Sequence, residues 1–328
     1  MESDTPPSKF HLIGRGACGT VWAATEAGPA YKREDGNPAR SLTNDYEMHQ
    51  RVLQSHRTLT KLKQKSTEHP RYPQIQIPAC HSFIQATDQW WITNLGKFPP
   101  EYSPCNTLHS QRIPPFNQST RELLIHNFCA DELKSTLLQS IPDRDCLVRL
   151  YLGRHRTHVR EYQTPSRFRA FSLRNFPLHA NQLVGLGVPT NDVHKYAETM
   201  AETLAMMHWI AGVDGNDVEI VLAAPNDVET NDDRMSNVLG DHSMWLLDFD
   251  LCRDMAMDEQ GGAQAVNAFW GNDPYYPRPG RDLALWSAFR TQYLKSSDQC
   301  LDLCDHQEGV RRRLLPRLFI ELLERQGM

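Results

Sequence analysis

The pattern of hydrophobic and polar residues divides the chain into an N-terminal part that favours strands and a longer part that favours helices. Residues 10–32 contain the segments Phe-His-Leu-Ile, Val-Trp-Ala-Ala and Ala-Tyr-Lys around glycine-containing turns, which predicts three consecutive strands. Residues 42–62 place apolar side chains three to four positions apart and predict a helix. Two short strands are expected at residues 74–77 and 90–93.

Helical periodicity dominates the rest of the chain. It covers residues 120–138 and 191–210 and returns after Asp282. The helix over residues 191–210 has the clearest apolar stripe, which consists of Tyr196, Met200, Leu204 and Met207. Short apolar strands are expected at residues 148–152, 220–222 and 244–249.

This order of elements predicts an α+β protein with two lobes. We expect a flexible tail over residues 1–9 and a small β-rich N-lobe over residues 10–96, which contains a glycine-rich loop. Proline-rich residues 97–119 are expected to connect the lobes. Residues 120–328 are expected to form a larger, mainly helical C-lobe that contains an acidic site loop.

Composition narrows the class of protein. Of the 328 residues, 40% are apolar and 23% are charged, which suits globular domains. The chain contains no uninterrupted apolar run near the ~18 residues of a membrane span, and its first residues lack the layout of a signal peptide. Eight dispersed cysteines are too few for a disulfide scaffold of this size. We therefore expect a cytoplasmic protein with reduced thiols and no membrane partner.

Charge is unevenly distributed, although the net charge is only −5. Residues 142–178 contain eight arginines and three acids, whereas residues 214–259 contain thirteen acids and two arginines. This asymmetry indicates two segments with different functions. Solvated helix faces are the alternative for either segment.

The motif Gly14-x-Gly16-x-x-Gly19 is the first candidate site. Glycine lacks a Cβ atom, so its backbone can approach a phosphate closely. Because the residues after Gly19 favour a strand, we expect a glycine-rich hairpin over a ligand rather than a dinucleotide-binding turn. Lys32 follows in the next strand, and Glu47 on the next helix is expected to pair with it. Ordinary turn glycines and an exposed strand-end lysine are the alternatives.

Two acidic motifs follow. One loop between a helix and a strand contains Asp214, Asn216, Asp217 and Glu219. Clustered carboxylates repel, so such a loop needs a cation, a metal or a guanidinium among them. Asp248 and Asp250 end the apolar segment 244–249 and are expected to face a cleft. A solvated turn and a strand-end cap are the respective alternatives.

The chain resembles protein kinases in the order of these motifs. The glycine loop, Lys32, Glu47, a His-x5-Asp stretch ending at Asp214, and Leu-Leu-Asp-Phe-Asp follow one another. The resemblance implies a protein-kinase-like two-lobed fold. There are departures: His-Arg-Asp and Ala-Pro-Glu are missing, Glu219 stands where a kinase has its metal-binding Asn, and Asp250 replaces the glycine of Asp-Phe-Gly. The phosphoryl-transfer machinery is therefore altered.

A second resemblance covers nearly the whole chain and rests on six blocks. They are Gly-x-Cys-Gly-Thr-Val-Trp-Ala (16–23), Arg-Leu-Tyr-Leu-Gly-Arg (149–154), Leu-Arg-Asn-Phe-Pro-Leu (173–178), His-Trp-x-Ala-Gly-Val-Asp-Gly-Asn-Asp-Val-Glu (208–219), Trp-Leu-Leu-Asp-Phe-Asp (245–250) and Asn-Asp-Pro-Tyr-Tyr-Pro-Arg-Pro (272–279). These blocks resemble a fungal family that carried a "zinc finger" label. It is similar to the arginine-containing cyclodipeptide synthases of fungal secondary metabolism. Those enzymes take aminoacyl groups from charged tRNAs, including arginyl-tRNA, and close a diketopiperazine that contains arginine.

The resemblance implies an acyltransferase that needs no cofactor and no ATP, because the tRNA ester is already activated. Acids are suited to an arginine substrate, since carboxylates bind guanidinium in a bidentate manner. One loop carboxylate, Asp217 or Glu219, is expected to deprotonate the α-amine. The expected catalytic residues are Asp214, Asn216, Asp217, Glu219 and Asp248. The expected substrate-binding residues are Gly14, Gly16, Cys18, Gly19, Lys32, Glu47 and Asp250. Cys18 is either a covalent nucleophile or a packed, inert thiol.

Charged tRNA is the expected partner, and DNA is not. Its phosphates require a basic surface, for which we expect Arg149, Arg154, Arg156, Arg160, Arg167, Arg169 and Arg174, unless these form an ordinary surface helix. No metal is expected, because Cys300-x3-Cys304-x-His306 supplies three ligands without a second pair. An ATP-dependent phosphotransferase and an inactive pseudokinase-like binding module are the alternative functions.

Overall fold

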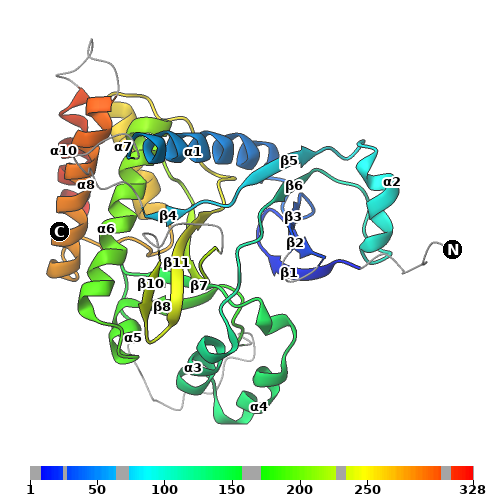
Figure 1. Ribbon diagram of the computed structural model, residues 1–328. Coiled ribbons are helices and arrows are strands. Elements are labelled where there is room, and N and C mark those ends of the chain that lie inside the picture. The colour runs from blue at the N-terminus through cyan, green and yellow to red at the C-terminus, as the bar shows by residue number, and fades with distance from the viewer. Residues whose placement is uncertain are drawn as a thin grey trace.

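The computed structural model describes residues 9–24, 28–63, 74–156, 171–226, 234–303 and 312–327. An antiparallel five-stranded sheet, in the order β1-β2-β3-β6-β5, forms the N-terminal part (Figure 1). Its strands are β1 (His11–Arg15), β2 (Thr20–Ala23), β3 (Ala30–Arg33), β5 (Cys80–Ile84) and β6 (Thr107–Ser110). The three strands that were expected within residues 10–32 are thus confirmed.

Two expectations for this part are wrong. Residues 90–93 form helix α2 (Trp90–Asn94), followed by the short turn η1 (Leu95–Lys97), and not a strand. Short apolar runs fit either element, and here the helical form places Trp91 in an aromatic cluster beside Phe98. The expected connector, residues 97–119, contains β6, which pairs with β3 and β5 inside the sheet. The first sheet therefore extends beyond the expected N-lobe boundary.

A second, six-stranded sheet lies in the middle of the molecule, in the order β10-β11-β9-β7-β8 with β4 paired to β11 (Figure 1). Its strands are β4 (Ile75–Gln76), β7 (Val148–Tyr151), β8 (Phe176–His179), β9 (Glu219–Ala223), β10 (Met235–Asn237) and β11 (Gly240–Leu247). The larger part of the protein thus contains a sheet in addition to the expected helices. Local periodicity predicts separate strands but not that segments more than 70 residues apart, such as β7 and β9, pair with each other.

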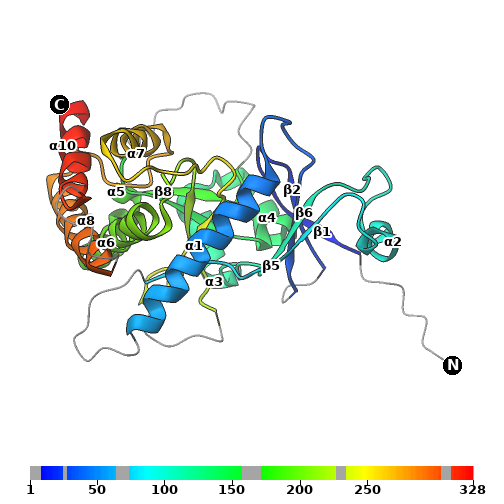
Figure 2. The same ribbon diagram turned by 90° about the horizontal axis from the view of Figure 1, so that it is seen from above.

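Helices cover this sheet on the side away from the first sheet (Figure 1). The helices of the protein besides α2 are α1 (Leu42–Lys63), α3 (Gln118–Phe128), α4 (Asp131–Gln139), α5 (Ala180–Gly185), α6 (Thr190–Met206), α7 (Glu259–Gly271), α8 (Leu283–Leu303) and α10 (Leu315–Gly327). Short turns of other helix types are η2 (Pro142–Arg144) and the π-helical η3 (Met207–Ala211). Seen from above, α1 crosses the boundary between the two sheets (Figure 2).

Helix α6 is the centre of the core, and its predicted stripe is confirmed. Tyr196, Met200, Leu204 and Met207 are all buried. The helix then widens into η3 and ends at Gly212, whose φ of 64° lies in the left-handed region that glycine adopts without strain. This end places the acidic loop directly beside the second sheet. Within the described residues, no helix combines the length and apolar content needed to cross a bilayer.

Candidate functional site

A cavity of about 170 Å3 lies between the two sheets. The first sheet lines it with the β1–β2 hairpin, β3 and β6, and the second sheet with β7, β9 and β11. Helix α1 adds Asp45 and His49 from the side. Elements far apart in the sequence therefore converge on one space.

Lys32 connects the two sides of this cavity. Its Nζ lies 2.6 Å from Asp45 Oδ2 and 2.6 Å from Asp248 Oδ1. Burial disfavours the charged form of Asp248, but the ion pair with Lys32 outweighs burial and the pKa of Asp248 is lowered. The same two carboxylates raise the pKa of Lys32 against the effect of burial. Lys32 and Asp248 are therefore both charged at neutral pH.

The expected pairing of Lys32 with Glu47 is wrong, because Glu47 is exposed on the outer face of α1. Asp45 takes its place, since it shares the buried face of α1 with Leu42 and His49. Positions three and seven residues apart lie on one helix face, whereas Glu47 is two residues from Asp45 and points elsewhere. The periodicity of α1 itself could have identified Asp45.

Asp217 and Asp250 meet at Arg40, which sequence reasoning missed. The Nη1 atom of Arg40 lies 2.7 Å from Asp217 Oδ2 and 3.0 Å from Asp250 Oδ1. Burial, followed by the charge of Asp248, raises the pKa of Asp250 to about 6. Both Asp217 and Asp248 have a left-handed φ, 61° and 65°, which is uncommon outside glycine and concentrates at functional sites.

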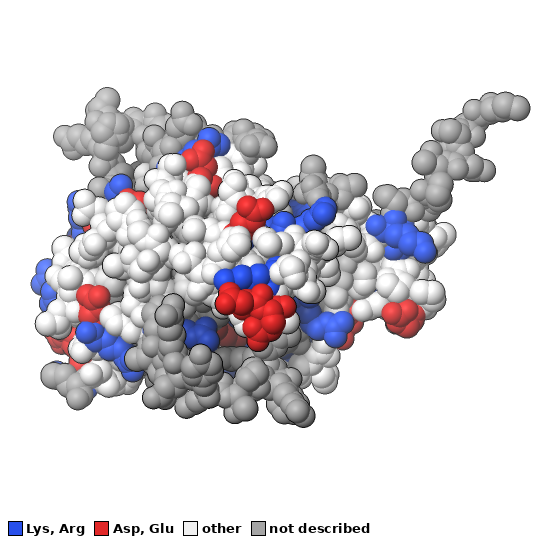
Figure 3. Space-filling model, turned by 90° about the horizontal axis from the view of Figure 1, so that it is seen from below, with Lys and Arg blue, Asp and Glu red and all other residues white. Residues whose placement is uncertain are grey.

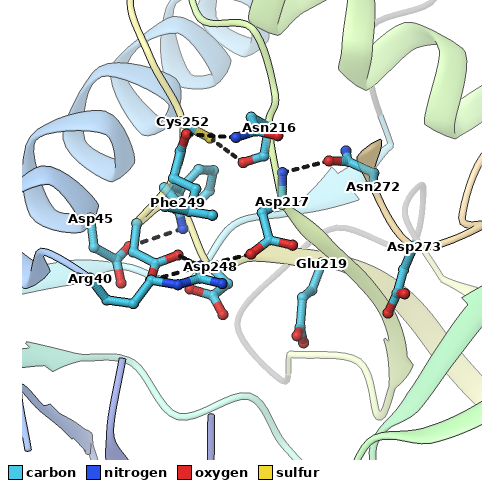
Figure 4. A network of polar contacts seen from close by, with 12 residues as sticks. Arg40, Asp45, Asn216, Asp217, Glu219, Asp248, Phe249, Cys252, Asn272 and Asp273 are labelled. Atoms are coloured by element: carbon cyan, nitrogen blue, oxygen red, sulfur yellow. Dashed lines mark hydrogen bonds and ion pairs between the residues drawn. The ribbon is translucent and has the colours of Figure 1, made fainter. Parts of the chain in front are cut away.

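Glu219 lies at the start of β9 and forms an ion pair with Arg149 of β7. Burial raises the pKa of Glu219 to about 7, although the Arg149 guanidinium opposes this shift. Figure 4 shows the side chains of Asp248, Asp217, Glu219 and Asp273 in a row. Arg149, which was expected on a basic surface, has a side chain that is 25% exposed and lines the cavity.

Asp214 and Asn216 hold the loop together and do not line the cavity. Asp214 is buried, and its carboxylate accepts hydrogen bonds from Arg253 N, Asn216 N and Gln264 Nε2. The side-chain amide of Asn216 donates to the carbonyl of Leu251. The expectation that these two residues are catalytic is therefore not supported by their positions.

Asn272, from the sixth sequence block, was not singled out as a site residue but positions the acidic loop. Its Oδ1 accepts from Asp217 N at 2.5 Å, and its Nδ2 donates to the carbonyl of Gly215 at 2.9 Å. These bonds stabilise Asp217 in its left-handed conformation (Figure 4). The signal was present, since the motif begins with this asparagine.

The glycines of the β1–β2 hairpin differ in whether the surrounding structure leaves room for a side chain. Gly14, Gly16 and Gly19 all line the cavity. A Cβ at Gly19, where φ is 153°, would lie 2.1 Å from the carbonyl oxygen of Arg33, whereas a Cβ at Gly16 meets nothing within 4 Å. Cys18 does not line the cavity and packs against Leu42 and Leu108. Burial raises the pKa of its thiol to about 12, so it is inert as a nucleophile at neutral pH.

Only part of the expected basic surface falls within the described residues. Arg154 and Arg156 are exposed and Arg174 is partly exposed, while Arg160, Arg167 and Arg169 lie outside the described residues. On the face seen in Figure 3, the described lysines and arginines are interspersed with acids rather than gathered into one patch. Among the described members of this set, Arg154 and Arg156 are thus the two exposed arginines.

One family model, DUF3669, described as a zinc finger protein, matches residues 244–304. This segment runs from β11 through Asp248 and Asp250 to the end of α8, which is less than a fifth of the chain. No curated protein matches the chain. Among the described residues, no three His, Cys, Asp or Glu side chains are arranged to hold a metal ion. Cys304 and His306 of the weak metal motif lie outside those residues.

Proposed function

We propose that the protein has a protein-kinase-like scaffold that serves acyl transfer instead of phosphoryl transfer. The glycine hairpin, Lys32 on β3, an acid on α1 and Asp248 after β11 around one cavity support the scaffold. The buried hydrogen bonds of Asp214 argue against the kinase reaction, because this residue stands where a kinase has its catalytic base. Glu219, at the position of the metal-binding Asn, is already paired with Arg149.

The proposed activity is that of an arginine-containing cyclodipeptide synthase that uses aminoacyl-tRNAs as substrates. The observation that carries it is the row of carboxylates Asp248, Asp217 and Glu219, of which Asp248 and Glu219 line the cavity. An arginyl group brings a guanidinium and an α-ammonium, and carboxylates bind both of these cations.

Glu219 is the proposed general base. Its pKa of about 7 allows it to accept a proton at neutral pH and to release it again. It takes a proton from the α-ammonium of one aminoacyl group, and the amine attacks the ester carbonyl of the other. A C–N bond forms and the C–O ester bond breaks; of the two protons that the nitrogen loses, one passes to the departing ribose oxygen and the other is released to solvent. Repetition within the resulting dipeptidyl-tRNA closes the ring and releases the second tRNA.

Direct transfer between the two tRNAs is favoured over a covalent enzyme intermediate. A thioester on Cys18 requires a thiolate, which the raised pKa of this buried thiol opposes. The aminoacyl ester remains bound to its tRNA until the amine attacks it.

The test is reconstitution with purified protein, tRNA, ATP, arginine, a second amino acid and the two aminoacyl-tRNA synthetases. A cyclic dipeptide that contains arginine should appear in the mass spectrum. Ribonuclease should abolish it, and ATP should be dispensable when the tRNAs are charged beforehand. An unchanged yield after ribonuclease treatment contradicts the proposal.

An ATP-dependent phosphotransferase is the second candidate, and the glycine hairpin above Lys32 favours it. Magnesium-dependent binding of ATP by calorimetry, with transfer of its γ-phosphate to any acceptor, would support it. If neither product nor ATP binding is found, the pseudokinase-like binding module is the remaining proposal. Charged tRNA in the cytoplasm is the partner in the favoured proposal, and a membrane or DNA has no role in it.

A further inference from the structure

The cavity has two chemically different halves. One half is apolar and is lined by Ile13, Val21, Ala30, Leu108 and Leu247. The other half is charged, with four acids (Asp45, Asp145, Glu219 and Asp248) and four cations (Arg15, Lys32, Arg112 and Arg149) in the lining. A ligand that fills both halves must combine an apolar ring or chain with a polar end that bonds to charged groups.

The strand geometry places these halves within the reach of one small ligand. Ala30 and Lys32 are two residues apart on β3, so they point to the same face roughly 7 Å from each other. Val21 of the hairpin lies directly opposite Lys32 in the antiparallel register. Leu247 and Asp248 are consecutive at the end of β11, where the apolar strand meets the charged groups.

Two further segments, the β1–β2 hairpin and the end of β6, border the apolar half. The hairpin passes over it with Gly14 and Gly16, and a Cβ at Gly16 would meet nothing within 4 Å. The last residue of β6, Ser110, and the next residue, Gln111, border it and carry hydrogen-bonding groups. Apolar walls with a polar edge suit a flat heterocycle such as a purine, which stacks between side chains and is recognised at its rim.

We infer that the apolar half binds the terminal adenosine of a charged tRNA and that the ester on its ribose extends into the charged half. This inference rests on the proposed function. Two different aminoacyl-tRNAs must react at the same base, and the part that they share is the 3′-terminal adenosine with its aminoacyl ester. The adenosine site therefore accepts either substrate and brings its α-amine to Glu219, while the ester of the other aminoacyl-tRNA approaches from outside this site.

The probe is a stable analogue in which an amide joins arginine to 3′-amino-3′-deoxyadenosine. Its binding is measured by calorimetry, so that no product has to form. Ala30→Leu fills the apolar half and should weaken binding at least tenfold. Ser82→Leu, which adds the same side chain to the same sheet, should change it less than twofold, because Ser82 bonds His109 on the face away from the cavity. Leu108→Ala, which enlarges the apolar half of the cavity, should also weaken binding of the analogue.

Two further measurements show whether the site binds the adenosine of a charged tRNA or that of free ATP. ATP with magnesium should compete with the analogue only weakly, and cyclic dipeptide formation should fall in Ala30→Leu and not in Ser82→Leu. Tight ATP binding combined with normal product formation by Ala30→Leu overturns the inference in favour of a free nucleotide. Unchanged analogue binding in both Ala30→Leu and Leu108→Ala overturns the site itself.

The failure of this inference is distinguishable from the failure of the proposed function. Product formation that is insensitive to Ala30→Leu removes the adenosine site and leaves the synthase. Analogue binding that is lost in Ala30→Leu, in a protein that forms no cyclic dipeptide, supports the site and removes the synthase. Thermal unfolding of each variant checks that loss of binding is not loss of the fold.

Discussion

The proposed role of Glu219 as general base can be tested through its pKa. Its carboxyl has a pKa raised to about 7 by burial, and a general base acts only when it has lost its proton. The rate of cyclic dipeptide formation should therefore rise with pH through about 7. Glu219→Gln should lower the rate by roughly 10²- to 10⁴-fold and remove this rise.

The matched control is Glu47→Gln, the same substitution at an exposed position of α1. It should leave both the rate and the pH profile unchanged. Initial rates from about pH 6 to pH 8 cover the range of the raised pKa. If Glu219→Gln keeps the same rising limb, another group is the base.

His208 belongs to the same sequence block as Glu219, residues 208–219, but has a structural role. It is fully buried, its Nδ1 lies 2.9 Å from the hydroxyl of Tyr293, and burial lowers its pKa to about 3. The folded protein thus keeps this imidazole neutral, whereas the unfolded chain protonates it near pH 6.5. Stability is therefore lost as the pH falls below about 6.5, because the unfolded state binds the extra proton.

The effect can be isolated with His208→Phe. Between pH 7 and pH 5, His208 should remove about 2 kcal/mol from the free energy of unfolding of the unmodified protein. The variant lacks this contribution, so its loss over the same interval should be smaller by that amount. Urea unfolding of both proteins at the two pH values measures the difference. Equal losses in the two proteins contradict a neutral, buried His208.

The β1–β2 hairpin shows at the scale of an element that a glycine motif has unequal members. A side chain at Gly19 would collide with the Arg33 carbonyl and adopt a φ of 153°, whereas Gly16 has open space. Gly19→Ala should destabilise the protein by more than about 2 kcal/mol, and Gly16→Ala should change stability by less than about 1 kcal/mol. Chemical denaturation of the two variants checks this, and a Gly19→Ala protein of normal stability contradicts it.

Elements with strong periodicity could be predicted from the sequence, and pairings between distant segments could not. The hairpin, β3 and α6 could be predicted from local patterns, because the spacing of apolar residues within each element has the period of a strand or of a helix. The paired residues of β6 and β5 are 23 to 30 positions apart and those of β6 and β3 are 74 to 80 positions apart, so nothing local encodes this pairing. The second sheet escaped prediction for the same reason.

The residues of the candidate site also fall into those that local sequence patterns identify and those that depend on contacts between distant segments. Lys32 was identified from its position after the glycine loop, Glu219 from the cluster of acids in one loop, and Asp248 and Asp250 from the end of an apolar strand. Arg40 was missed because it lies in a loop, and its partners are more than 170 residues away. Arg149 was assigned to a surface because eight arginines share one segment, and its ion-pair partner Glu219 lies 70 residues away on β9.

At the scale of the whole molecule, the net charge of −5 is a sum over groups with different environments. Several acids are concentrated at the cavity, where they are buried and partly paired. Arg154 and Arg156 are exposed instead. The backbone of Arg156 is anchored to Asn181 of α5 through its N–H at 3.0 Å and its carbonyl at 2.7 Å. A negative total charge is therefore compatible with a local contact to phosphate.

This arrangement predicts how tRNA binding depends on salt. Each arginine that contacts a phosphate releases counterions and contributes roughly 0.7 to 0.9 to the slope of log K against log salt concentration. Arg154→Ala combined with Arg156→Ala should therefore reduce the slope by about 1.5 and weaken binding most at low salt. Arg317→Ala, at an exposed position of α10, should leave the slope unchanged. Filter binding of charged tRNA at a series of salt concentrations measures the slopes, and equal slopes in all three proteins would place the tRNA on another surface.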